Sequence, residues 1–164
     1  MDDVGGEQPD LSKVRKFDGG YPIYYSGDEV AGHPLEEVFG EEGGGVFIYG
    51  DCEPEPTGDG ETCNPPLQIH NYDICDRPPP SFNKGPLYDF RGAKARGGGG
   101  TSIKDPMEIF TGRTTVKIGS EDKLTKAAAA ALRTVRQARP PSRLPPPAPG
   151  SLQGKMPCPD KPGD

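Results

Sequence analysis

The sequence contains no tryptophan and few hydrophobic residues of any kind. Of its 164 residues 31% are hydrophobic, whereas glycine (24) and proline (21) together exceed a quarter of the chain. Such a proline and glycine content is typical of chains with disordered segments. We therefore expect a small core and about 110–120 ordered residues, which is still enough for one folded domain.

The sequence also lacks any long apolar run. No stretch approaches the ~18 consecutive apolar residues that indicate a membrane-spanning helix. The first seven residues, Met1–Glu7, contain neither a basic nor an apolar segment, so they do not have the pattern of a secretory signal. The sequence as written predicts a cytoplasmic protein, and a misassigned start site would change this expectation to an extracytoplasmic one.

Catalytic motifs are missing as well. The chain has two histidines, His33 and His70, and no nucleophile motif accompanies them. The glycine run 97–100 lacks the frame of a phosphate-binding loop. We therefore expect no catalytic residues, no cofactor and no enzymatic activity.

Charge is unevenly distributed along the chain, whose net charge is −6. Residues 1–60 hold 15 acidic and three basic residues, whereas residues 113–164 hold four acidic and ten basic ones. We interpret this as an acidic and a basic part that balance each other in one fold. The overall acidity and the absence of aromatic residues among the basic ones argue against a nucleic-acid partner.

Several short segments have the composition of strands. They are rich in aromatic and β-branched residues and are bounded by turn residues. One of them, 67–72, alternates so that Leu67, Ile69 and Asn71 share one face. The sequence predicts strands at 21–25, 46–49, 67–72 and 87–91 and a hairpin of 106–110 with 114–118, and a short helical turn or loop at 34–39.

One helix is expected near the C-terminal end. Apolar residues recur at helical spacing from Leu124 to Val135, Ser120 is placed to cap the start, and 140–141 are prolines. The predicted fold class is α+β, with an antiparallel or mixed sheet of about five or six short strands packed by this helix. The predicted organisation is a flexible arm at 1–16, one domain at 17–139 and a disordered, proline-rich tail at 140–164.

The four cysteines give the first candidate site. Cys52 and Cys63 bracket a short acidic loop, and a disulfide between them would stabilise the fold by about 3 kcal/mol. The lack of an export signal argues for reduced thiols, which would then be small buried apolar groups. A third reading is a zinc site of Cys52, Cys63, His70 and Cys75, although its spacing lacks a close cysteine pair. Cys158, in the tail, is expected to be a free thiol.

The predicted tail carries a possible protein-binding motif. Residues 143–149 fit the R-x-x-P-x-x-P pattern of ligands that bind aromatic grooves as polyproline II. In a chain so rich in proline the match carries little weight, and we expect a plain tail.

Part of the chain resembles a known group of proteins. The segments 21–25, 47–52, 63–69, 75–77 and 111–116 resemble those of small uncharacterised proteins of high-GC actinobacteria, a likeness that covers roughly residues 17–139. That group has no assigned activity, so the resemblance implies neither a catalytic residue nor a cofactor. It implies one folded unit with a tail added at each end.

Two functions follow from this reading. The first is a small non-catalytic binding or interaction module of unknown partner, with its surface around Asp51, Cys52, Cys63, His70 and Cys75. The second is a small zinc-binding or thiol-dependent protein that uses the same cysteines and His70.

Overall fold

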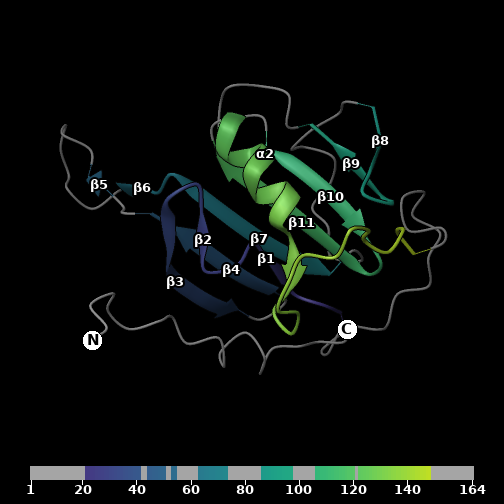
Figure 1. Cartoon of the computed structure of the whole chain (residues 1–164), viewed down its shortest axis with the longest axis horizontal. Coiled ribbons are helices and arrows are strands. Elements are labelled where there is room, and N and C mark those ends of the chain that lie inside the picture. The colour runs from purple at the N-terminus through teal and green to yellow at the C-terminus, as the bar shows by residue number, and fades with distance from the viewer. Residues whose placement is uncertain are drawn as a thin grey trace, which may run out of the picture.

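The protein is built on one eight-stranded antiparallel sheet (Figure 1). The computed structural model describes residues 21–41, 44–50, 53–54, 63–73, 86–97, 106–120 and 122–148. In spatial order the strands of the sheet are β2 (Glu29–Val30), β3 (His33–Glu41), β4 (Gly44–Tyr49), β7 (Leu67–Asp73), β11 (Thr114–Ser120), β10 (Met107–Thr111), β9 (Ala93–Arg96) and β8 (Tyr88–Phe90).

The predicted α+β class is confirmed, but the sheet is larger than predicted. It has eight strands rather than five or six, and two small ladders accompany it. In one ladder β1 (Tyr24–Tyr25) pairs with β12 (Arg133–Thr134), and in the other β5 (Glu53–Pro54) pairs with β6 (Cys63–Asn64).

Most predicted strands are present, and one prediction is wrong. The hairpin β10–β11 forms around Gly112, whose φ of +55° suits a glycine, and β7 buries Leu67, Ile69 and Asn71 as expected. Residues 34–39, predicted as a helical turn or loop, belong to β3. The pair Glu36–Glu37 obscured the alternation, because a bulge between Leu35 and Glu37 shifts the pairing with β4.

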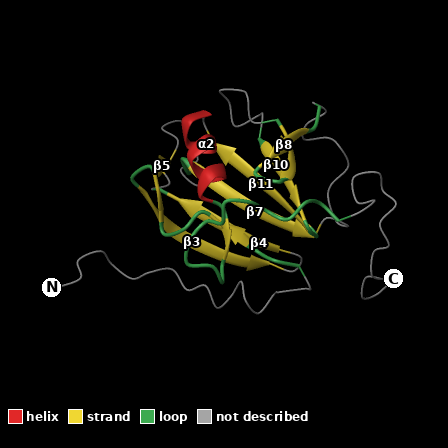
Figure 2. Ribbon diagram, turned by 45° about the vertical axis from the view of Figure 1, so that its right-hand side comes forward, coloured by secondary structure: helices red, strands yellow, loops and turns green. Residues whose placement is uncertain are grey.

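The helix α2 (Asp122–Ala131) crosses one face of the sheet, as Figures 1 and 2 show. It ends before Val135, the last apolar residue of the predicted helical face, because Arg133–Thr134 pairs with β1 instead. Ser120 does not cap the helix either: it lies in β11, and its hydroxyl donates a hydrogen bond to the Pro66 carbonyl (2.7 Å). The alanines are nevertheless placed as expected, with Ala128 and Ala129 buried against the sheet.

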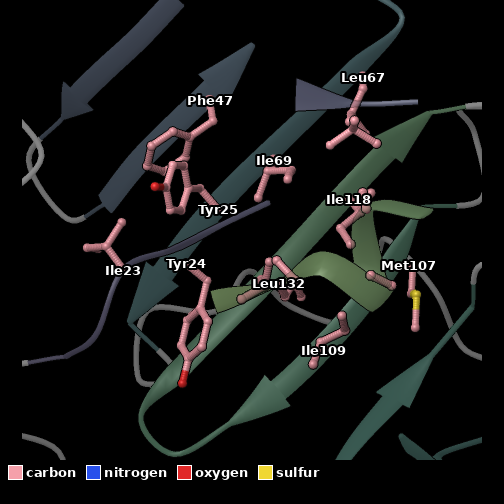
Figure 3. Packing of buried hydrophobic residues seen from close by; sticks show 14 of the residues in the cluster. Ile23, Tyr24, Tyr25, Phe47, Leu67, Ile69, Met107, Ile109, Ile118 and Leu132 are labelled. Carbon is pink, nitrogen blue, oxygen red and sulfur yellow. The ribbon is translucent and has the colours of Figure 1, made fainter. Parts of the chain in front are cut away.

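The core lies between the sheet and this helix (Figure 3). Phe47, Ile69, Ile118 and Ile109 project from four strands toward Leu132 and the aromatic segment that contains β1. Register explains the layer, because Phe47 pairs with Ile69 and Ile69 pairs with Ile118, so these side chains share one face. We call this the core face of the sheet, and its opposite the distal face.

Buried polar groups fix the N-terminal segment to the core face. The Asn71 side chain accepts a hydrogen bond from the Tyr24 amide and donates to the Tyr24 carbonyl, both at 2.8 Å. The Tyr49 hydroxyl accepts from the Ser26 amide (2.9 Å) and donates to the Gly27 carbonyl (2.7 Å). Burial raises the pKa of Tyr49, so its hydroxyl stays protonated and keeps donating.

The described residues continue past 139, the predicted end of the domain. Residues 140–148 pass along the ends of two hairpins, and Leu144 is buried there with 3% of its surface exposed. The predicted boundary between domain and tail therefore falls inside the described part of the chain, and the division into arm, domain and tail stays a prediction. The rest of the predicted tail, and the predicted arm at 1–16, lie outside the described residues.

Candidate functional site

Most of the predicted cysteine site lies outside the described residues. This holds for Asp51, Cys52 and Cys75, and also for Cys158. Cys63 lies on β6, where its backbone pairs with that of Pro54. The disulfide between Cys52 and Cys63 and the zinc site therefore stay predictions. Within the described residues, no group of three or more His, Cys, Asp or Glu side chains could hold a metal ion.

His70 lies on the distal face rather than at the rim of the sheet. It sits on β7 between the core residues Ile69 and Asn71, so its side chain projects away from the helix. Its Nε2 atom lies 3.1 Å from Oε1 of Gln68, and its ring stacks on Tyr72 with centroids 6.3 Å apart. It is about 10 Å along the strand from Leu67, where the chain returns from the cysteine loop.

The strand register aligns His70 with charged side chains across the sheet. It pairs with Lys117 on β11, Lys117 pairs with Glu108 on β10, and Glu108 pairs with Arg96 on β9. Glu108 is 4% exposed, so a carboxylate lies buried between two cationic side chains. Cross-strand pairs of opposite charge stabilise a sheet, and a buried carboxylate requires such partners.

Burial and the neighbouring carboxylate act on Lys117 in opposite directions. Burial, the larger effect, lowers its pKa, and the negative charge of Glu108 raises it. Beside this row the Arg96 guanidinium lies over the ring of Phe110, 5.7 Å from the ring centre. Lys94 and Asp89 form an ion pair at the next position outward, which lowers the pKa of Asp89.

The other half of the distal face is apolar and aromatic. On β3 and β4 its side chains are those of Glu37, Phe39, Val46 and Ile48, and on β7 those of Gln68, His70 and Tyr72. Phe39 is 44% exposed, Glu37 is exposed as well, and the others are half-buried. An apolar half beside a charged half is an arrangement that can bind a second surface; within the described residues it includes no nucleophile paired with a base.

The residues on β3 and in the charged row were not identified from the sequence. The predicted hairpin does not give the row, because its loop of 111–113 places Glu108 opposite Val116, whereas the observed pairing of Thr111 with Thr114 places Glu108 opposite Lys117. Phe39 and its neighbours were missed because their segment was not predicted as a strand.

Comparisons with known proteins give no further guide. No family model matches the chain, and searches of curated proteins and of solved structures find no match. In the described residues no helix is long and apolar enough to cross a membrane.

Proposed function

We propose that the protein is a non-catalytic binding module and that its distal face binds a protein partner. The observation that carries this proposal is that apolar and charged side chains occupy separate, adjacent halves of that face. A half-buried apolar and aromatic half, in which Phe39 is exposed, adjoins a charged half in which three cations, Lys94, Arg96 and Lys117, stand against the carboxylates of Asp89 and Glu108.

The composition of this face fits a protein partner better than a small molecule. Small-molecule sites are concave and enclose most of their ligand, whereas this face is the surface of an extended sheet. Aromatic residues and arginine are enriched in protein interfaces, and an exposed ring such as Phe39 supplies contact area at small entropic cost. The charged half holds three cations and two carboxylates, and Glu37 adds a third carboxylate in the apolar half, so the face suits a partner surface that carries apolar side chains and charges of both signs.

In this proposal the acidic loop between Cys52 and Cys63 has a structural role in the module. The loop joins β4 to β7, which are adjacent strands of the aromatic half. A disulfide between Cys52 and Cys63 would limit its conformations in the unfolded chain. The proposal needs neither a metal nor a reactive thiol.

Two exposed aromatic residues allow a matched test. Phe39 on the distal face and Tyr88 on the edge strand β8 are 44% and 41% exposed. We would replace each in turn with the photo-crosslinking residue p-benzoylphenylalanine, irradiate cells of the source organism, and compare the adducts. We expect a discrete protein adduct from position 39, absent from position 88, that weakens when Ile48→Gln is added.

Three results would contradict the proposal. They are an adduct from position 88 alone, equal adducts from both positions, or no adduct from position 39 in a chain shown to be folded.

A further inference from the structure

The segment 141–148 occupies a surface built by the turns of two hairpins. The turn Arg91–Gly92 joins β8 to β9, and the turn at Gly112 joins β10 to β11. The Leu144 amide donates to the Arg91 carbonyl (2.6 Å), and the Thr111 hydroxyl donates to the Pro145 carbonyl (2.7 Å). We call this surface, formed by Arg91, Gly92, Thr111 and Gly112, the turn site.

Gly112 binds the segment in the manner of a strand. Its amide donates to the Pro146 carbonyl and its carbonyl accepts from the Ala148 amide, both at 2.9 Å. The two bonds make Pro147 the partner of Gly112 in a parallel bridge. Adding an extended peptide to a free backbone edge is a common mode of peptide recognition, and consecutive prolines hold such a peptide extended.

Arg91 connects the segment to the helix. Its guanidinium donates to the carbonyls of Ala129 (2.8 Å) and Leu132 (3.2 Å) at the end of α2, and also to that of Pro141. Arg91 has a φ of +50°, which is uncommon for a residue with a side chain. Gly92 is required beside it, since a Cβ atom there would lie 2.9 Å from the Leu144 carbonyl oxygen.

One side chain anchors the segment. Leu144 is 3% exposed, whereas Ser142, Arg143, Pro145 and Pro146 are exposed. Within 144–148 the atoms that form hydrogen bonds with the turn site are main-chain atoms, so the site recognises an extended backbone. The segment also follows the last strand, β12, so its release would leave every pairing of the main sheet intact.

From these observations we infer that the turn site is a binding site for proline-rich peptides and that residues 141–148 are its displaceable internal ligand. The partner it fits is a protein segment with a leucine followed by prolines. The leucine fills the position of Leu144, and the carbonyls after it accept the hydrogen bonds of Thr111 and Gly112. This inference is independent of the proposed function, because the turn site lies at the hairpin turns and the proposed protein partner binds the distal face of the sheet.

The test uses the full chain and a peptide of sequence RLPPPAP. In the variant Leu144→Ser the internal segment loses its anchor, so the site becomes available. By NMR titration we expect the peptide to bind this variant at least tenfold more tightly than the wild type, with the largest shifts at the Gly92 and Gly112 amides. A control peptide with serine in place of leucine is expected to bind at least tenfold more weakly, and adding Thr111→Val is expected to weaken binding of RLPPPAP.

Equal affinity of the wild type and the folded variant, or no binding to that variant, would overturn the inference. If the wild type forms a dimer and the Leu144→Ser variant does not, the segment 141–148 binds the turn site of a second copy of the chain. That result would overturn the inferred partner. If the variant does not fold, hydrogen exchange in the wild type tests whether the segment 141–148 is displaceable. We expect the Leu144, Gly112 and Ala148 amides to exchange at least tenfold faster than that of Ile118, and equal rates would show that the segment is not displaceable.

Discussion

The two faces of one sheet differ in what their side chains do. On the core face Phe47, Ile69 and Ile118 are fully buried and pack under the helix. On the distal face Val46, His70 and Lys117 keep part of their surface in solvent, whereas Glu108, Phe110 and Thr115 of β10 and β11 are as buried as the core. On β4 and β7, therefore, adjacent residues of one strand serve different faces, so the distal side chains of these two strands can be changed with little effect on the core.

The largest contrast is expected between two phenylalanines on neighbouring strands. Phe47→Ala on the core face leaves a cavity and should lower the free energy of unfolding by about 3–5 kcal/mol. Phe39→Ala on the distal face should lower it by less than about 1 kcal/mol. Urea denaturation of both variants measures the difference. Similar losses would show that the distal face is also a core.

The two faces of β7 should differ in the same way when a side-chain amide is replaced, because the amide of Asn71 is buried on the core face and that of Gln68 lies on the distal face. Asn71→Leu removes the hydrogen bonds to Tyr24 and Gly45 and leaves their backbone groups buried without this partner. The expected loss is about 2–4 kcal/mol in urea denaturation. The matched control is Gln68→Leu, which faces the distal side and should change the free energy of unfolding by about 0.5 kcal/mol at most.

Arg91 tests whether the helix end and the segment 141–148 are one unit with the core. Arg91→Ala removes the donor to the carbonyls of Ala129, Leu132 and Pro141, and should cost about 1–3 kcal/mol. It should also accelerate hydrogen exchange at the Leu144 amide. Arg139→Ala, an exposed arginine of the same region, is the control and should change neither quantity measurably.

Alkaline pH should destabilise the core face through Tyr49. Burial raises its pKa above the ordinary value of 10.0, so the folded state holds its proton at pH values where the unfolded state loses it. This contribution to stability is complete below pH 10 and declines above it, by at most about 1.4 kcal/mol per pH unit. Urea denaturation from pH 9 to pH 11 should show a smaller decline in Tyr49→Phe, and an equal decline would contradict this assignment.

The smallest expected change concerns the cysteines. If Cys52 and Cys63 form a disulfide, the mass of the non-reduced chain lacks two hydrogens, and Cys63→Ser abolishes this difference whereas Cys158→Ser keeps it. Native mass spectrometry of the same samples should show no metal. One zinc per chain would instead favour the zinc-binding reading of Cys52, Cys63, His70 and Cys75, and would contradict a metal-free module.

Local patterns in the sequence predicted the α+β class, the hairpin at Gly112 and the buried face of β7. Each depends on alternation or turn residues within a few positions. The bulge in β3, the pairing of Arg133–Thr134 with β1 and the docking of Leu144 depend on contacts between distant segments, which no local pattern contains. The C-terminal end of α2 is an example. The cation that binds its last carbonyls is Arg91, which comes from a turn about 40 residues earlier in the chain.

The candidate site was predicted only in part for the same reason. His70 was selected by residue type and grouped with the cysteines, whereas its neighbours in the fold are Gln68, Tyr72 and Lys117. The row across the sheet becomes visible only when the register of four strands is known.

The yield of crosslinked partner from position 39, relative to position 88, decides whether the distal face is the binding surface. A binding module that uses its distal face should give a protein adduct from position 39 and none from position 88. Equal yields from the two positions, or an adduct from position 88 alone, would show that the distal face is not the binding surface.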